Sequence, residues 1–366
     1  MTITIVAGAR TVFAVCVLAL LTATGAGAGD AYWHGSRSTD WSDGVQGSVS
    51  NWYARPPHAT PNTPLPVPTT AAIFAPGARN HAVVVTGQVR IEEMVFTPGD
   101  FFPGTGQYGI GVGGFAGLTV TGRGLINRST VAPSILLAPY ATMRFTNAAR
   151  IVSGSGSIQI TSHGGSLHFW DTSKGGDATV SNTHSGDRYG TVLFLGRSSA
   201  GSMIIANAGK TGLAFFDHSS AGDADLANNY DFSAPLEPQI NFRRTRGPAG
   251  DHKLTAGSIA NNFGKVIIGE NQITVLRTFT QGADGTLEID VVGSRAGAVR
   301  VKGPTRIDGT LVVKTDNPRI GRYVILRPTG GRRGLFSRVR YTGLPATLKG
   351  RITYLGTDVV LFIERR

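Results

Sequence analysis

The stretch LAFFDHSSAGDADLAN at residues 213–228 repeats in outline two earlier stretches, LHFWDTSKGGDATVSN at 167–182 and VLFLGRSSAGSMIIAN at 192–207. The shared frame is aliphatic-x-Phe-x-(Asp/Gly)-x-Ser-x-x-Gly-x-x-x-aliphatic-x-Asn, and its phenylalanines are 25 and 21 residues apart. The recurring residues are Phe169, Phe194 and Phe215; Ser173, Ser198 and Ser219; Gly176, Gly201 and Gly222; Val180, Ile205 and Leu226; and Asn182, Asn207 and Asn228.

This spacing predicts a β-solenoid in which each repeat forms one coil. A period in the low twenties is typical of solenoids, and each unit alternates apolar and polar residues on both sides of a Ser-x-x-Gly turn. One unit is too short to bury its apolar side chains, but stacked coils bury them as a continuous ladder, with strands about 4.8 Å apart. We therefore predict an all-β fold, a right-handed parallel β-helix, whose clearest coils span residues 143–228 with a fainter first copy around Phe145.

The consecutive residues Asp217, His218, Ser219 and Ser220 have the composition of catalytic machinery, but the repeat favours a structural role. The serine recurs in every copy, whereas the equivalents of His218 are a threonine and an arginine. A catalytic triad needs one unique set of mutually oriented side chains. We therefore predict an exposed turn, in which Asp and Ser bond local backbone amides and Gly adopts a positive φ.

Weaker copies of the pattern flank the clear repeats. Short alternating strands with glycine turns are expected at 83–96 and 118–129, and again at 265–293. Residues 227–263, which include several prolines and the charged run NFRRTRGPAGDHK, break the rhythm. This segment predicts either a protruding loop or a degenerate coil.

Three regions follow along the chain. Residues 1–28 are assigned to a signal peptide and residues 29–290 to the β-helix. Residues 291–366 are assigned to a basic C-terminal β cap, in which Ile307–Val313 and Tyr323–Leu326 are the strands expected to close the helix.

The first 28 residues have the pattern of a secretory signal. Arg10 is the only charge before the apolar run Thr11–Thr22, and Ala26-Gly27-Ala28 is an A-x-A-like cleavage site. The run is shorter than the ~20 residues of a membrane-spanning helix, so we expect no transmembrane segment in the mature chain. The only cysteine, Cys16, lies within this signal, so the mature chain has no disulfide. We expect the protein in the periplasm, at the cell surface or outside the cell.

The charge balance is strongly basic, with a formal net charge of +12. From Arg295 onward an arginine-rich tract is opposed only by Asp308, Asp316, Asp358 and Glu364. Such a surface attracts anionic polymers, and for an exported protein these are polysaccharides or a host or cell surface rather than nucleic acid. The residues predicted to bind a polyanion are Arg332, Arg333, Arg338 and Arg340.

The ordered motifs resemble the passenger regions of bacterial autotransporters, the pertactin-like β-helix family with a repeated β-strand motif. YWHGSRSTDWSDGVQGSVSNWYA, beginning at Tyr32, is similar to the family's opening W-x-G…D-W…N-W pattern, and LTVTGRGLINRS, at 118–129, is similar to a later segment. The Phe-x-Asp-x-Ser-x-x-Gly repeats and the carboxyl segments FTQGADGTLEIDV and GRYVILRPTGG complete the likeness. The resemblance implies an exported β-helix with a C-terminal folding cap. The sequence lacks the outer-membrane barrel that follows such passengers, so we expect a stand-alone periplasmic or secreted relative, one half of a split system with a separate outer-membrane translocator, or the remnant of a longer gene.

Two functions are compatible with this reading. The first is a non-enzymatic, adhesin-type protein at the cell surface or secreted, with a plain spacer as its simplest form. The alternative is a carbohydrate-active β-helix enzyme, a polysaccharide lyase or glycosidase, which would need paired carboxylates. The acidic candidates for that alternative are Asp171, Asp177, Asp187, Asp217, Asp223 and Asp225. His163 is expected in a glycine turn, the eight histidines show no metal-binding spacing, and no catalytic residue or cofactor is assigned.

Overall fold

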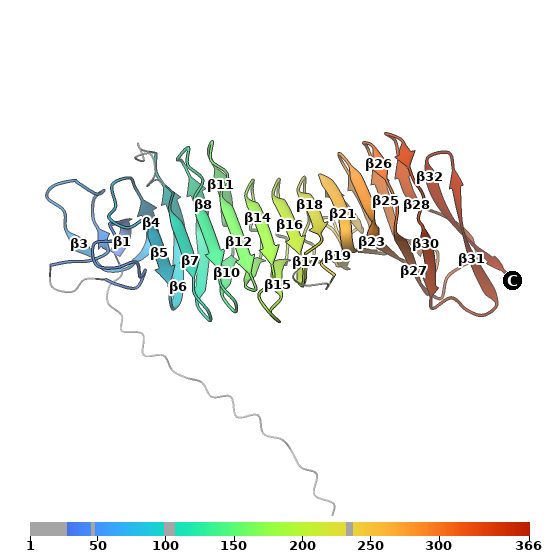
Figure 1. Cartoon of the computed structure of the whole chain (residues 1–366), viewed down its shortest axis with the longest axis horizontal. Helices are drawn as coiled ribbons and strands as arrows, with labels where there is room; N and C mark the ends of the chain where they lie inside the picture. The colour runs from blue at the N-terminus through green and yellow to red at the C-terminus, as the bar shows by residue number, and fades with distance from the viewer. Residues whose placement is uncertain (1–27, 45–47, 99–106, 232–236) are drawn as a thin grey trace, which may run out of the picture.

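The computed structural model describes residues 28–44, 48–98, 107–231 and 237–366 and shows an elongated rod of stacked β coils (Figure 1). All regular elements of these residues are strands. They form a parallel β-solenoid of about 10 turns that ends in a C-terminal sheet, which confirms the predicted fold class. The described residues include no helix that is long and apolar enough to span a membrane. Of the predicted signal peptide, only Ala28 lies among them.

Each coil passes through three walls, and hydrogen bonds join each strand in register to its neighbours in the same wall. The first wall contains β5 (Ala82–Val85), β7 (Gly109–Val112), β9 (Ser134–Leu137), β12 (Gln159–His163), β14 (Thr179–Thr183), β16 (Ile204–Ala208), β18 (Asp225–Asn229), the N-terminal parts of β21 (Ser258–Gly269) and β23 (Phe279–Val292), β26 (Thr305–Arg306) and β29 (Arg332–Arg333). The second wall contains the N-terminal parts of β6 (Gln88–Phe96) and β8 (Gly117–Asn127), β10 (Thr142–Phe145), β13 (Ser166–Phe169), β15 (Gly190–Phe194), β17 (Thr211–Asp217), β19 (Gln239–Thr245), the C-terminal parts of β21 and β23, β27 (Thr310–Asp316) and β30 (Arg338–Thr342).

The third wall is divided into two stretches. The first contains β1 (Ala28–Trp33), β4 (Pro68–Phe74), the C-terminal parts of β6 and β8, and β11 (Arg150–Ser153). The second contains β20 (Lys253–Ala256), β22 (Gln272–Val275), β25 (Ala298–Val301), β28 (Gly321–Pro328), β32 (Asp358–Arg365) and β31 (Leu348–Leu355). Between them this wall is reduced to single-residue bridges from Arg150 through Lys174 and Ser199 to Ser220. The remaining short strands are β2 (Trp52–Tyr53), β3 (Pro64–Leu65) and β24 (Arg295–Ala296).

A phenylalanine ladder fills the middle coils. Consecutive rings lie 4.8–5.0 Å apart and are almost parallel, and every ring is fully buried. The spacing equals that of neighbouring strands, because the side chains alternate in and out along each strand and stay in register between coils. The ladder consists of Phe145, Phe169, Phe194, Phe215 and Phe242.

An asparagine ladder runs parallel to it inside the first wall. Asn182 Nδ2 donates to Asn207 Oδ1 over 2.9 Å, Asn207 Nδ2 to Asn228 Oδ1 over 3.2 Å, and Asn228 Nδ2 to Asn261 Oδ1 over 3.1 Å. All four side chains are fully buried. The ladder therefore pairs polar groups that would otherwise destabilise the core.

The recurring glycines occupy left-handed turns. Gly176, Gly201 and Gly222 have φ of 64°, 68° and 62°. A Cβ at Gly201 would lie 2.8 Å from the carbonyl oxygen of Gly176, and one at Gly222 equally close to that of Gly201. Only glycine avoids both the strain and the clash, which explains its recurrence.

The described residues of the segment 227–263, namely 227–231 and 237–263, belong to a coil, which favours the second of the two alternatives left open. They contribute the end of β18, then β19, β20 and the start of β21. Phe242 and Asn261 in this segment extend both ladders. The rhythm is lost in the sequence because the connections between these strands are longer than in the clear repeats.

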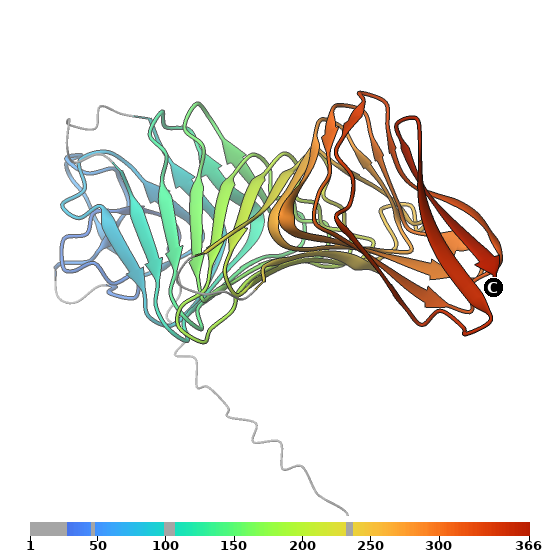
Figure 2. The same cartoon turned by 45° about the vertical axis from the view of Figure 1, so that its right-hand side comes forward.

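The two ends of the rod differ in construction. At the N-terminal end, Trp33, Trp41 and Trp52 pack edge to face with ring centres about 5 Å apart, and all three are fully buried. At the C-terminal end, β28, β32 and β31 pair antiparallel (Figure 2). Of the strands expected to close the helix, β28 takes part in this end, whereas the strand at 310–316 continues the parallel second wall.

Candidate functional site

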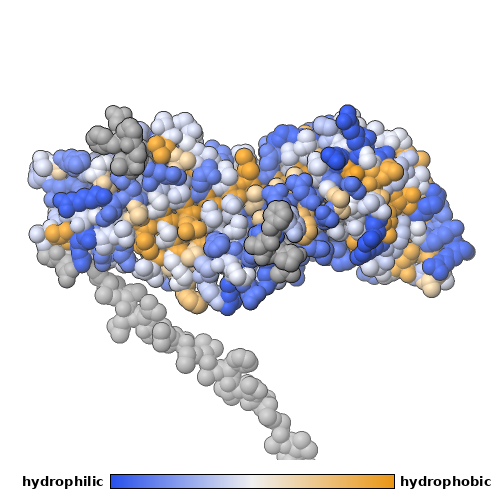
Figure 3. All heavy atoms as spheres, in the orientation of Figure 1, coloured by the Kyte–Doolittle hydropathy of each residue, from blue (hydrophilic) through white to orange (hydrophobic). Residues whose placement is uncertain are grey.

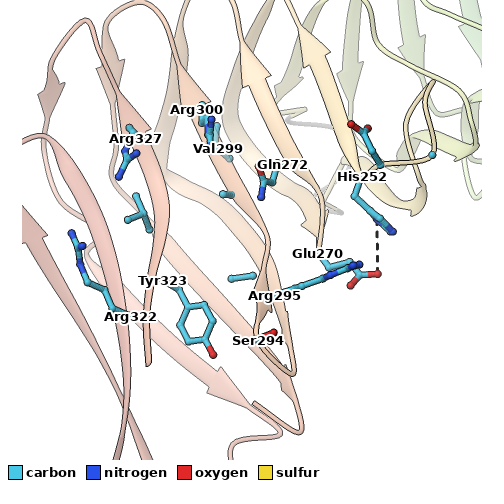
Figure 4. A pocket seen from close by; sticks show the side chains of 15 residues that line it. His252, Glu270, Gln272, Ser294, Arg295, Val299, Arg300, Arg322, Tyr323 and Arg327 are labelled. Atoms are coloured by element: carbon cyan, nitrogen blue, oxygen red, sulfur yellow. Dashed lines mark ion pairs between the residues drawn. The ribbon is translucent and has the colours of Figure 1, made fainter. Parts of the chain in front are cut away.

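A groove of about 670 Å³ opens on the outside of the third wall, in the C-terminal half of the rod (Figure 4). It forms because β28 pairs with β25 only through Leu326–Pro328. A bulge between Val324 and Leu326 lets the preceding residues pair with β32 alone, and a bulge bends the strand that carries it. The first half of β28 thus diverges from β24 and β25 and leaves an open space.

Four arginines line this groove. Arg295 comes from β24, Arg300 from β25, and Arg322 and Arg327 from β28; all four are exposed. Arg327 Nε lies 3.2 Å from Asp358 Oδ2. The other three guanidinium groups have no hydrogen-bond or ion-pair partner within the described part of the chain. The groove therefore presents unneutralised positive charge on neighbouring strands, a pattern that favours an anionic ligand. We call these residues the arginine groove.

The far end of the groove is polar and partly acidic. His252 Nδ1 lies 3.0 Å from Asn271 Oδ1 and 3.9 Å from Glu270 Oε1. The Asn271 side chain is buried and donates to the Phe242 carbonyl oxygen over 2.6 Å, so the imidazole is held by the last coil of the phenylalanine ladder. Figure 4 shows Arg295 extended along the groove toward Glu270. Positive charge is thus concentrated at the β25–β28 end.

The four arginines predicted to bind a polyanion lie elsewhere and do not form one cluster. Arg332 and Arg333 are in β29 of the first wall, whereas Arg338 and Arg340 are in β30 of the second wall. Arg332 is already engaged: its Nε donates to the Thr357 carbonyl oxygen over 3.0 Å. Binding by these four residues stays a prediction.

Sequence reasoning did not single out the arginine groove, although its residues belong to the basic tract. Arg300 and Arg327 are cross-strand partners in register. That proximity depends on which residue of β28 pairs with β25, and the sequence carries no repeat at this point from which the register could be read.

The opening Asp-His-Ser stretch forms a turn, and Ser219 bonds a local backbone amide as predicted, but the bonding of Asp217 differs from the prediction. Asp217 Oδ2 accepts the backbone N–H of Gly196, one coil earlier, over 3.1 Å. Its carboxylate therefore links coils instead of bonding its own turn. His218 Nδ1 lies 3.2 Å from the Gly247 carbonyl oxygen.

The prediction of an exposed turn is wrong for Ser220, which is buried, and more clearly for Ser219. Its side chain is fully buried, and its hydroxyl accepts the Phe216 N–H over 2.9 Å. The same position is buried in Ser173 and Ser198. This position of the repeat therefore faces the core in all three coils.

The other acidic candidates are distributed along the turns, and the contacts that can be assigned are to backbone or to single cations. Asp171 Oδ2 accepts the Asn147 N–H over 2.9 Å, and Asp177 Oδ1 accepts the Ser153 N–H over 3.0 Å. Asp187 lies 3.6 Å from Lys210 Nζ.

Arg277 links the last two acidic candidates. Its Nη2 lies 2.5 Å from Asp225 Oδ1 and 2.9 Å from the Asp223 carbonyl oxygen. The predicted loop residue His163 lies at the end of β12, next to the left-handed Gly164. Among the residues that the structure describes, no three His, Cys, Asp or Glu side chains are grouped so that they could hold a metal ion.

Comparison with known proteins identifies no family. No protein-family model matches the sequence, and no curated protein matches it either.

Proposed function

We propose that the chain is an exported, non-enzymatic β-solenoid of the adhesin type, which binds an acidic polysaccharide through the arginine groove. The observation that carries the proposal is the placement of Arg295, Arg300 and Arg322, three exposed guanidinium groups without an acidic partner, around one groove. A ligand with repeated negative charges along a chain would neutralise several of them at once.

The shape of the groove supports a polymer rather than a small compact anion. It opens along the outside of a wall and is lined by residues from four successive parallel strands or their turns. Guanidinium groups present planar donors that fit carboxylates and sulfates in pairs. An extended acidic chain lying across the strands would meet Arg300 of β25 and Arg322 of the neighbouring β28.

The sequence supports export and the autotransporter-passenger likeness. The tryptophans of the family's opening pattern, Trp33, Trp41 and Trp52, are the residues that close the N-terminal end of the rod. Their place at the first coil agrees with the position of that pattern in the family.

The test is retention on heparin resin at increasing salt. One variant replaces Arg295, Arg300 and Arg322 with Gln, and a charge-matched control replaces Arg333, Arg338 and Arg340 with Gln. Both lose three positive charges from exposed positions, but only the first set lines the groove. We expect the groove variant to elute at clearly lower salt than the control, since clustered charges act on one ligand chain.

Two outcomes would contradict the proposal. Equal elution of both variants would assign retention to net charge alone. If the groove variant eluted like the wild type and only the control were retained less, the binding surface would lie on β29 and β30 instead.

A further inference from the structure

A pair of exposed aromatic side chains stands on the corner between the first and second walls, far along the chain from the arginine groove. Phe115 and Tyr140 stack with ring centres 4.6 Å apart and planes 15° from parallel. Their exposed fractions are 76% and 42%. Both have left-handed backbones, with φ of 64° and 68°.

This arrangement does not help the chain to fold. Large side chains in the left-handed region are strained, and the corners of other coils use glycine, such as Gly164 and Gly209 with φ of 70° and 68°. An exposed Phe gains little from burial. A role in contacting another molecule would explain why two neighbouring coils both retain an aromatic residue here.

One outer face of the Phe115–Tyr140 stack is covered by another side chain, and the other is open. The outer face of Tyr140 is covered by the guanidinium of Arg188, 4.0 Å from the ring centre, which reaches it across the side-chain-free Gly164. On the opposite side, the corner one coil earlier consists of Thr86 and Gly87. Thr86 Oγ1 is turned away to Asp40 Oδ2 over 2.9 Å, so the outer face of Phe115 is left open.

A small polar notch of about 90 Å³ adjoins Phe115. Because Gly117 has no side chain, Gln88 can lie directly over it. Gln88 Nε2 donates to the Phe115 carbonyl oxygen over 3.1 Å. Thr119 and Thr142 complete the lining, together with the exposed Arg144.

We propose that this corner is a second glycan subsite, which takes a single uronic acid residue of an acidic polysaccharide. The apolar face of the pyranose ring stacks on Phe115, and its carboxylate enters the notch toward Arg144. The two features match the two halves of such a sugar: a flat C–H face for the ring, and a cation with amide and hydroxyl groups for the acid. The notch is too small for a whole sugar ring, which leaves the ring on Phe115.

This subsite rests on the proposed function only for its ligand class, because it shares no residue with the arginine groove. The probe is an oligomer of galacturonic acid, titrated calorimetrically, with its methyl ester as the matched uncharged ligand. We expect the acid to bind the wild type and the groove variant, and the ester to bind more weakly to both. Arg144→Gln is expected to reduce the difference between acid and ester.

Phe115→Gly separates binding from folding. Glycine relieves the left-handed strain, so the melting temperature is expected to be unchanged or higher, while affinity falls about tenfold through loss of the stacking face. The matched control is Tyr189→Ala, another exposed aromatic residue near this corner, with Lys210 Nζ 4.6 Å from its ring centre and outside the lining of the notch; it is expected to bind like the wild type.

Three results would overturn the subsite. They are unchanged affinity in Phe115→Gly, an equal loss in Tyr189→Ala, and a lowered melting temperature in Phe115→Gly, which would make Phe115 a structural residue. Loss of heparin retention by the groove variant with preserved Phe115-dependent binding would support both sites. Failure of the groove test leaves this titration fully interpretable, because the groove variant is one of its samples.

Discussion

The middle coils (residues 142–231 and 237–242) and the C-terminal coils (residues 253–366) belong to the same solenoid but differ in their cores and in their third wall. The middle coils repeat phenylalanine at one inner position and, from Asn182 on, asparagine at another, and after β11 their third wall is a row of single-residue bridges. The C-terminal coils have mixed aliphatic cores and a full third wall, and their outline is wider (Figure 2). In the space-filling view the rod narrows between the two parts, and apolar residues cover part of the middle coils (Figure 3).

This difference shows what repetition provides and what it prevents. Where the coils repeat, each strand of the first two walls follows its neighbour in register along its length. The groove appears only where the repeat has ended and β28 can leave β25. Regular coils therefore supply stiffness, and irregular coils supply shape.

The largest effect is expected from the phenylalanine ladder. Phe194→Ala removes a fully buried ring that stacks on both neighbours, and should lower the free energy of unfolding by about 3–5 kcal/mol. Val313→Ala, at a buried aliphatic position of the C-terminal coils, should cost roughly 2 kcal/mol. Urea unfolding measures both. Equal losses would mean that the ladder stabilises no more than ordinary packing.

Acid should weaken the two regions in separate pH ranges. Burial, aided by the charge of Arg144, lowers the pKa of His168 in the middle coils from 6.5 to about 4. The unfolded chain then binds this proton more readily, so stability falls between pH 6.5 and 4, by roughly 3 kcal/mol at about 1.4 kcal/mol per pKa unit. His168→Asn should flatten this part of the profile measured by thermal melting.

Glu288 in the C-terminal coils responds at lower pH. Burial alone would raise the pKa of this carboxyl, but hydrogen bonds and charges from Lys314 and Arg243 lower it below 4.5. Its stabilisation is therefore complete above pH 4.5 and lost below that value. Glu288→Gln should remove the loss below pH 4.5 and leave the loss that His168 causes. If both variants instead lost stability in the same single pH transition, the two regions would not respond to acid independently.

A moderate effect is expected from the asparagine ladder. Asn207→Ala removes two ladder hydrogen bonds: Asn228 Oδ1 loses its donor, and Asn182 Nδ2 loses one of its acceptors. A buried polar group that loses its partner costs about 1–3 kcal/mol. The measurement is the urea midpoint, with Asn262→Ala as the control, because Asn262 is exposed and donates to Asn229 Oδ1 over 3.2 Å. A loss no greater than the control's would show that water or neighbouring carbonyls replace the ladder.

The smallest effect distinguishes buried from exposed serines. Ser219→Ala removes a buried acceptor of the Phe216 N–H and should cost about 1 kcal/mol. Ser337→Ala in the C-terminal coils removes an exposed hydroxyl bonded to the Gly309 carbonyl oxygen, and should stay within about 0.5 kcal/mol. Thermal melting measures both variants. A larger loss of stability in Ser337→Ala than in Ser219→Ala would contradict the burial of Ser219 in the core.

The sequence was sufficient to predict the coils wherever spacing was regular. Phe169, Phe194 and Phe215 could be aligned because their connections have similar lengths. Phe242 and Asn261 were missed because they follow 27 and 33 residues after their ladder partners, although a search for Phe and Asn at any spacing would have found them.

The groove could not be predicted in this way. It depends on a bulge near Val324 and on the antiparallel partner β32, two features of pairing between distant strands. The burial of Ser219 was missed for a related reason: the sequence indicates a turn, but whether the serine faces the core depends on how the third wall narrows to single bridges.

The asparagine ladder also gives the rod a sense of direction. Every amide points its nitrogen toward the C-terminal neighbour, and the row begins at the Asn182 oxygen, which has no partner among the described residues. Turning one amide over would set two donors or two acceptors face to face, so the four orient together or not at all.

The rod can therefore gain length only in whole coils that carry the ladder asparagine. Duplicating a coil with its asparagine would lengthen the row by one link without creating a new end. Inserting a coil without it would cut the row in two and add a second unpaired oxygen inside the core. The rod can thus be extended by copying the coils it already has far more readily than by accepting foreign ones.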